Sequence, residues 1–103
     1  AKINGKLTVS ENVADLGGIA AALEAAKKEE DFSAEEFFTN FARIWRMKAR
    51  TEYMQLLASV DVHAPGKLRT NVQLPNFDEF FETFDVKEGD GMWRKPEDRV
   101  IIW

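Results

Sequence analysis

Two short motifs in this sequence carry side chains that could do chemistry together. Glu11-Asn12-Val13-Ala14-Asp15 spaces two carboxylates four residues apart, so on a helix they lie on one face, one turn apart. His63-Ala64-Pro65-Gly66-Lys67-Leu68-Arg69 sets the single histidine of the sequence in a Pro-Gly segment shortly before an arginine. Carboxylates and imidazole bind metal ions and move protons, and arginine binds carbonyl and carboxylate oxygens.

Each motif alone also has an ordinary structural explanation. An acidic pair early in a helix is typical of a solvated first turn, where carboxylates favour the positive end of the helix dipole. His63 and Arg69 alone are compatible with a surface histidine beside a turn and an arginine paired with a carboxylate. Taken one at a time, the motifs leave a chemical and a structural role open.

The element that must position the two carboxylates is a predicted helix from Ser10, a suitable N-cap, to Lys28. Its expected buried face is formed by residues at helical spacing: Leu16, Ile19, Leu23 and Ala26. Gly17-Gly18 costs this helix about 1 kcal/mol per glycine relative to alanine. Close approach of another backbone would explain the pair, and so would a tolerated weak point.

The residues before this helix predict a β-hairpin. Asn4-Gly5 is typical of a two-residue hairpin turn between Ile3 and the run 6–9. Because so few residues precede the turn, we expect the partner strand to lie outside this sequence.

Further helices follow from apolar spacing and capping signals. Ser33 with Glu36 has the spacing of a capping box and begins a helix whose apolar stripe is Phe37, Phe38, Phe41, Ile44 and Trp45. Residues 51–57 predict another helix after a bend near Arg50, and 60–75 an ordered loop. Asn76 with Glu79 predicts a last, short helix with Phe77, Phe80, Phe81 and Phe84 inward. The fold class is therefore mainly α, with about four helices and long ordered loops.

Composition excludes several classes of protein. The 103 residues, 45% of them hydrophobic, are enough for one compact core. A net charge of −4, with scattered basic residues, argues against a nucleic-acid partner. With no cysteine, disulfides and cysteine-based zinc sites are excluded and a reducing environment is favoured. No apolar run approaches the roughly 18 residues needed to span a bilayer, so we expect no membrane partner.

In combination, the motifs resemble the neprilysin and endothelin-converting-enzyme family of zinc endopeptidases. Residues 4–8 followed by Glu-Asn-x-x-Asp-x-Gly-Gly at 11–18 are similar to the segment with that family's third zinc ligand. Asp-x-His-x-Pro-Gly at 61–66 with Arg69 is similar to a later family segment. Other similar stretches are 37–45, 76–80 and 99–103. The resemblance implies that 1–103 is a C-terminal part of a thermolysin-like (gluzincin) catalytic domain.

This resemblance implies a role for each of four residues. Glu11 corresponds to the third ligand of one catalytic Zn²⁺, and Asp15 to a residue that orients a zinc-binding histidine. His63 corresponds to the donor that binds the oxyanion, and Arg69 to the residue that binds a backbone carbonyl of a small peptide substrate. The family's His-Glu-x-x-His helix is absent from these residues. We therefore expect this piece to be inactive alone, to bind zinc weakly and to need the remainder of its parent chain.

Departures from the family indicate a location and leave an alternative function. Extracellular animal members carry cysteines where Arg46 and Asp98 stand here. This favours a cytoplasmic bacterial relative, similar to the oligopeptidases of lactic acid bacteria, over a cell-surface or secreted protein. The alternative function is a non-catalytic helical interaction module derived from the same family. The small residues Gly17, Gly18, Ala20, Ala21 and Ala22 also predict that the piece self-associates through 11–26 or is loosely folded there.

Overall fold

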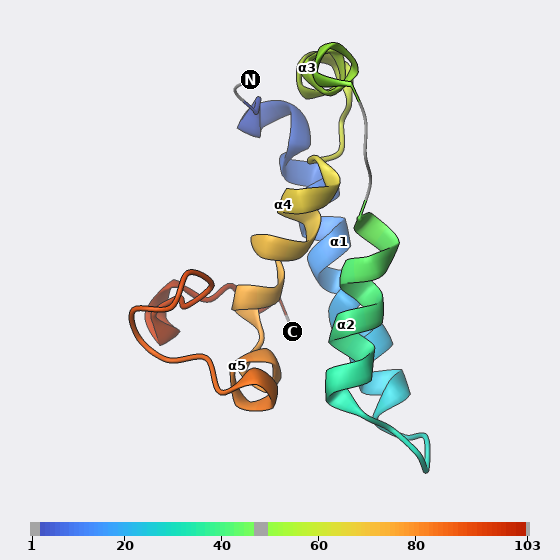
Figure 1. Cartoon of the computed structure of the whole chain (residues 1–103), viewed down its shortest axis with the longest axis vertical. Coiled ribbons are helices and arrows are strands. Elements are labelled where there is room, and N and C mark those ends of the chain that lie inside the picture. The colour runs from blue at the N-terminus through green and yellow to red at the C-terminus, as the bar shows by residue number, and fades with distance from the viewer. Residues whose placement is uncertain (1–2, 47–49, 103) are drawn as a thin grey trace.

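A computed structural model describes residues 3–46 and 50–102, and this part of the chain is helical without strands (Figure 1). The helices are α1 (Gly5–Ala26), α2 (Ala34–Trp45), α3 (Thr51–Val60), α4 (Gly66–Asn71) and α5 (Asp78–Phe84). Two 3₁₀ turns, η1 (Leu74–Asn76) and η2 (Pro96–Asp98), complete the order. The mainly α fold is confirmed, and α4 is added to the predicted helices. Arg50, near which a bend was expected, has an extended backbone and precedes α3, whereas the terminal Trp103 lies outside the described part.

Helix α1 begins before the predicted Ser10, and the predicted hairpin at Asn4-Gly5 is wrong. The Asn4 Oδ1 atom accepts hydrogen bonds from the backbone N–H groups of Lys6 at 3.1 Å and Leu7 at 3.2 Å. Asparagine is among the strongest N-caps, and no strand among the described residues is available to pair with 6–9. The cap therefore decides the local structure. Of the predicted buried face, Leu16, Ile19 and Leu23 are buried, whereas Ala26 is partly exposed.

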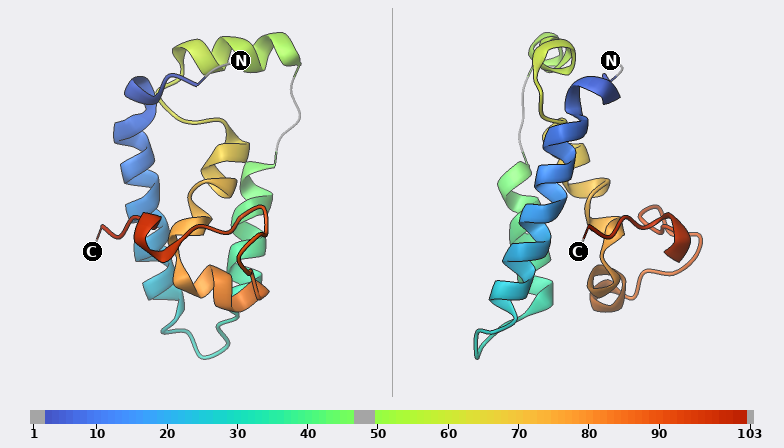
Figure 2. Two further views of the ribbon diagram at one scale, coloured as in Figure 1. Left: turned by 90° about the vertical axis from the view of Figure 1, so that its left-hand side faces the viewer. Right: turned by 180° about the vertical axis from the view of Figure 1, so that it is seen from behind.

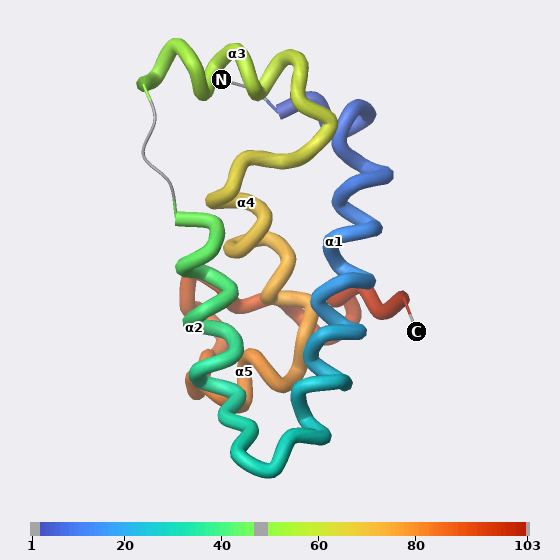
Figure 3. The backbone as a smooth tube through the Cα atoms, turned by 90° about the vertical axis from the view of Figure 1, so that its right-hand side faces the viewer, coloured from blue at the N-terminus to red at the C-terminus, as the bar shows by residue number. Residues whose placement is uncertain are grey.

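Helices α1 and α2 form an antiparallel hairpin (Figure 3). As predicted, Ser33 caps α2, its Oγ accepting the backbone N–H of Glu36 at 3.3 Å. Phe38 in the middle of α2 is buried, but Ile44 near its end is 71% exposed. The prediction that Ile44 belongs to the core is wrong, because the core cluster takes Phe38 from α2, with Phe37 and Phe41 packed against it, and Ile44 in the last turn lies outside that cluster.

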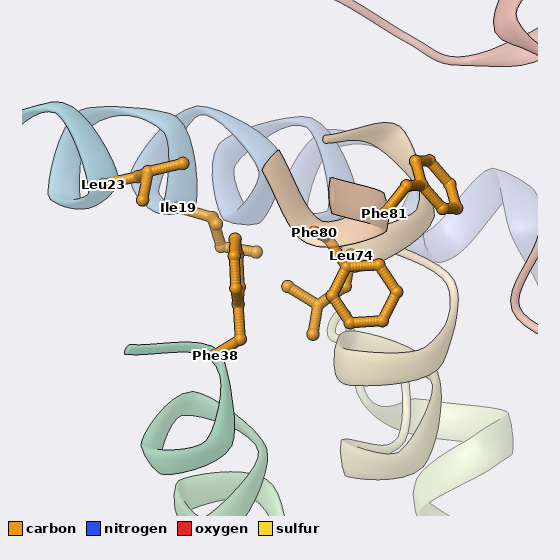
Figure 4. Close-up of a cluster of buried hydrophobic side chains, with 6 residues drawn as sticks. All are labelled: Ile19, Leu23, Phe38, Leu74, Phe80 and Phe81. Carbon is orange, nitrogen blue, oxygen red and sulfur yellow. The ribbon is translucent and has the colours of Figure 1, made fainter. Parts of the chain in front are cut away.

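The hydrophobic core lies where α1, α2 and α5 converge (Figure 4). Aromatic rings form its centre: Phe38 meets Phe80 edge-on with centroids 5.6 Å apart, and Phe80 meets Phe81 at 5.7 Å. The buried members are Ile19, Leu23, Phe38, Leu74, Phe80 and Phe81. Edge-to-face aromatic pairs add to the stabilisation that comes from burying their area.

The segment expected to be a loop, 60–75, contains the short helix α4. The Pro65 carbonyl accepts the N–H groups of Leu68 at 2.9 Å and Arg69 at 3.0 Å, which closes the first turn. A proline just before a helix costs no intrahelical hydrogen bond, because the N–H group at that position would have no helical partner. The Pro-Gly pair therefore starts this helix and does not prevent it.

Asn76 does not cap α5, so the predicted capping box with Glu79 is wrong. Phe77 occupies the N-cap position without a side-chain hydrogen bond. Asn76 is buried, and its Oδ1 accepts the backbone N–H of Val100 at 2.9 Å and a hydrogen bond from the Arg94 guanidinium. The side-chain oxygen that was expected to cap α5 therefore accepts hydrogen bonds from the C-terminal tail instead. Of the inward aromatics predicted for α5, Phe80 and Phe81 are buried and Phe84 is 40% exposed.

Helix α3 lies at the end of the molecule near the start of α1, away from the aromatic core (Figures 1 and 3). Large apolar side chains on it are exposed: Tyr53, Met54, Leu56 and Val60. At the other end of the chain, the tail passes α5 and reaches α1 (Figure 2). Val100 and Ile102 of the tail line a small hollow with Leu16. Among the described helices, none has the length and apolar character to cross a bilayer.

Candidate functional site

Helix α1 presents both candidate carboxylates on one side, as the spacing predicted. The Glu11 side chain is 42% exposed and that of Asp15, one turn further, is 19% exposed. Leu16 and Ile19 follow on the buried face and hold this part of α1 against the rest of the fold. Gly18 is exposed, with open space where a Cβ would lie, so no described backbone approaches it. The self-association expected from these small residues stays a prediction.

His63 lies between α3 and α4 and faces Glu11. Its Nε2 atom is 3.2 Å from the Glu11 Oε2 atom, although the two residues are far apart in the sequence. On its other side, Nδ1 is 3.1 Å from the Asp61 Oδ1 atom, which also accepts the backbone N–H of His63 at 3.0 Å. Carboxylates only accept, so making both ring contacts at once requires the imidazolium; a neutral ring makes one of them.

The Asp61 carboxylate is held ionised by its neighbours. The backbone N–H of His63 lowers the pKa of Asp61 below its usual range, and the imidazole of His63 adds to that effect. Sequence reasoning missed Asp61 as a member of the site. The sequence contained a signal for it, because aspartate commonly accepts the backbone N–H of the residue two positions later in an Asx turn, and that residue here is His63.

Arg69 on α4 binds Asp15 on α1 through a side-on pair of hydrogen bonds. Its Nε donates to Oδ2 and its Nη2 donates to Oδ1, both at 2.7 Å. The guanidinium carbon also lies 3.7 Å from the centroid of the Trp45 ring. Bidentate geometry and stacking together fix the orientation of the fork. Trp45, which the sequence analysis assigned to a core stripe, is therefore a support for Arg69.

Gly66 allows α4 to start close to the end of α2. A Cβ at this position would lie 2.5 Å from the Trp45 carbonyl oxygen, so a larger residue would push the two helices apart. The proline and glycine of the His-x-Pro-Gly motif thus place Arg69 over Trp45 and leave His63 facing α1.

The four candidate residues are brought together as two neighbouring pairs, Glu11 with His63 and Asp15 with Arg69. His63 and Arg69 also line a cleft of about 1070 Å³. The remainder of its wall is mostly apolar and includes Trp45, Leu57 and Phe84. A concave, apolar site with a few charged groups is typical of small-molecule or peptide binding.

The metal-binding side chains among the described residues do not form a complete metal site. Within 3–46 and 50–102, no group of three or more His, Asp or Glu residues is arranged to hold a metal ion. A catalytic zinc ion needs three protein ligands and an open fourth position. Glu11 is accessible enough to serve as one ligand, but the described residues do not form a complete zinc site by themselves.

Comparison with known proteins gives a consistent set of matches. The family model described as Peptidase family M13 matches residues 1–100. Neutral endopeptidase of Lactococcus lactis subsp. lactis is 61% identical over 100 residues, which cover 97% of this chain and 16% of the relative. Neutral endopeptidase of Lactobacillus helveticus is 48% identical over 103 residues, covering 100% of this chain and 16% of the relative.

More distant relatives include neprilysin of Homo sapiens, which is 33% identical over 114 residues covering 98% of this chain and 15% of the relative. The chain thus spans about 16% of the length of the bacterial relatives that it matches. No solved structure gives a significant match.

Proposed function

Since this chain belongs to peptidase family M13, we propose that residues 1–103 are part of the catalytic domain of a zinc metalloendopeptidase that hydrolyses small peptides. One observation carries the proposal: Glu11 and Asp15 on α1 meet His63 and Arg69 as two adjacent pairs beside one cleft. Both pairs join α1 to residues 63–69, so the two motifs that are far apart in the sequence meet at one place in the fold. The bacterial relatives named neutral endopeptidase support the same reaction class.

In this proposal Glu11 is the third protein ligand of one Zn²⁺, and two histidines from a His-Glu-x-x-His segment elsewhere in the parent chain are the others. A zinc ion bound there supplies a water that is nucleophilic at neutral pH. We expect the described residues alone to be inactive and to hold zinc weakly, because they offer too few ligands.

His63 stabilises the charge that develops on the substrate. Its Nε2 lies 3.2 Å from the proposed ligand carboxylate of Glu11, so a donor on that nitrogen sits at the edge of the metal site. Attack on a peptide carbonyl turns its oxygen into an oxyanion, and a fixed N–H donor at that point lowers the barrier. Asp61 accepts the N–H of the other ring nitrogen and holds the imidazole in place, and with that contact made Nε2 is a donor in the imidazolium form of the ring.

Asp15 and Arg69 orient the groups on either side of the scissile bond. Asp15 accepts two hydrogen bonds from Arg69, and a carboxylate has about four acceptor sites, so it can also accept the N–H of a zinc-binding histidine. Arg69 uses two of its five N–H donors on Asp15 and lines the cleft. Its remaining donors bind a backbone carbonyl of the peptide.

The alternative function is a non-catalytic helical interaction module, favoured by the exposed apolar side chains of α3. Under it, the remainder of the parent chain is not needed to complete a metal site, and the complete protein cleaves no peptide with or without zinc.

We expect a cytoplasmic bacterial peptidase, with a cell-surface or secreted location as the alternative.

Two substitutions in the complete protein test the proposed roles. Glu11→Gln should remove zinc and activity together, because a neutral amide is a poor zinc ligand. His63→Phe should keep zinc and lower kcat by about 10²- to 10³-fold, the usual loss for one oxyanion donor. Zinc content and steady-state hydrolysis of a small peptide are measured for both, with exposed Glu30→Gln as the control. Release of zinc by His63→Phe, or full activity in Glu11→Gln, would contradict the assigned roles.

A further inference from the structure

In the described part of the chain, three polar side-chain contacts join α1 to residues 61–73, and the contact made by Gln73 is the uncharged one. The other two links are the pairs Glu11 with His63 and Asp15 with Arg69. The Gln73 side chain donates from Nε2 to the backbone carbonyl of Asn12 at 2.9 Å. Gln73 is 7% exposed, and Asn12 lies between the two catalytic-site carboxylates of α1.

The backbone on both sides of Gln73 is anchored independently. Arg94 donates through Nη2 to the Val72 carbonyl at 2.8 Å and also donates to the Asn76 side chain. Val100 donates its backbone N–H to the same Asn76 oxygen at 2.9 Å. Residues 72–76 are therefore held by the C-terminal tail, and Gln73 extends from this fixed segment to α1.

The ion pair of Glu11 with His63 is open to water, so it does not hold α1 to the segment before α4 equally well at all salt concentrations. The Glu11 and His63 side chains are 42% and 39% exposed. Salt weakens ion pairs that water reaches. The hydrogen bond from Gln73 is neutral and buried, so salt weakens it less and it is the better spacer.

We infer that Gln73 is a positioning residue that sets the spacing between the carboxylates of α1 and the His63 and Arg69 side chains. This inference rests on the proposed peptidase function. Gln73 does not line the cleft, and it acts through Arg69, which lies on α4, the short helix that leads to Gln73. Displacement of a substrate-binding group by about 1 Å costs up to roughly 100-fold in rate.

The test uses the complete protein with Gln73→Met, which keeps the length of the side chain and removes its donor. We expect kcat/KM per bound zinc to fall by about 10-fold or more, within the range for residues that orient site groups. Val72→Thr, at an exposed neighbouring position, should leave kcat/KM unchanged. The second readout is coupling: in an Arg69→Lys background, Gln73→Met should cause little further loss, whereas a merely structural role would give the full loss again.

A second variant keeps the inference testable if Gln73→Met folds poorly. Gln73→Glu presents an acceptor to the Asn12 carbonyl when ionised and a donor when protonated, and burial raises the pKa of such a carboxyl group. Its kcat/KM relative to wild type should therefore rise as the pH falls from about 7.5 to about 5.5. A wild type without zinc-dependent activity would refute the proposed function. An active wild type, together with unaffected or fully additive Gln73 variants, would refute this inference alone.

Discussion

The two halves of α1 are held by different forces. Its second half packs Ile19 and Leu23 onto the aromatic rings of α2 and α5, where nearly all side-chain area is removed from water. Its first half carries Glu11 and Asp15, which are held to α4 and the preceding loop by polar contacts. Burial stabilises without direction, whereas ion pairs and hydrogen bonds fix geometry at modest net stability. The aromatic half is built to hold the fold, and the polar half to place charged groups.

Helix α3 sharpens this contrast. It lies at the polar end, and Tyr53, Leu56 and Val60 on it are each more than half exposed (51%, 54% and 61%). By contrast, Phe38 on α2 and Phe80 and Phe81 on α5 are buried against one another. In the proposed function the remainder of the parent chain covers α3, so the polar end is the part of the molecule that is completed from outside.

The largest effect is expected in the aromatic half. Phe38 is 1% exposed, and Phe38→Ala should destabilise the 103-residue chain by about 3–5 kcal/mol, through lost burial and the cavity left behind. Ile44→Ala on the same helix, at a 71% exposed position, should change stability by less than about 0.5 kcal/mol. Chemical denaturation followed by circular dichroism measures both. Equal losses for the two variants would show that the core is not where the structure places it.

A smaller effect is expected at the polar end. Arg69→Met removes two charge-assisted hydrogen bonds to Asp15, whose side chain is only 19% exposed, and should cost about 1.5–3 kcal/mol. Lys87→Met, which removes an exposed pair with Asp85, is the matched control and should cost less than about 0.5 kcal/mol. If Arg69→Met cost more than Phe38→Ala, the polar half and not the aromatic half would hold the fold.

The smallest effect belongs to an ion pair in the aromatic half, between Lys27 at the C-cap of α1 and Glu79 on α5. The hydrogen bond between them lowers the pKa of Glu79 below 4.5 and is the main cause that raises the pKa of Lys27 above 10.5. Because the folded pKa of Glu79 is lowered, its ionisation stabilises the fold above about pH 4.5, and this stabilisation is lost as the pH falls through the folded pKa. Because the folded pKa of Lys27 is raised, its charge stabilises the fold below about pH 10.5, and this stabilisation is lost as the pH rises through the folded pKa.

Lys27→Met should therefore remove less than about 1 kcal/mol between these limits, because both side chains are 36% exposed and screened. Denaturation of wild type and variant across pH, at low and high salt, measures the difference. A loss that is independent of both pH and salt would show that Lys27 acts through packing of its hydrocarbon chain and not through the ion pair.

The parts of the fold that sequence patterns predicted well are those set by local spacing. The buried face of α1, the Ser33 cap and the inward rings Phe80 and Phe81 follow from helical periodicity and capping chemistry. The errors at Asn4 and Asn76 share one cause. Asparagine serves turns, caps and buried hydrogen bonds, and the choice depends on tertiary partners, such as Val100 for Asn76, that local patterns do not contain.

The sequence indicated the four residues of the candidate site, but not the contacts that hold them in place. Motif order led to Glu11, Asp15, His63 and Arg69, and the structure brings these four together. That Arg69 binds Asp15 and stacks on Trp45, and that Gln73 reaches the Asn12 carbonyl, depends on the packing of α4 against α1 and α2. No spacing in the sequence signals those contacts, because they join residues more than twenty positions apart.

Zinc titration tests the central claim, that these residues supply one ligand and the transition-state groups of a site completed elsewhere in the parent chain. Isothermal titration at neutral pH should show no stoichiometric zinc binding tighter than micromolar in the 103-residue chain, because three suitable ligands are not assembled among the described residues. The complete protein should bind one zinc ion tightly and lose it in Glu11→Gln. A nanomolar site in the 103-residue chain, or tight binding that survives Glu11→Gln in the complete protein, would contradict the account.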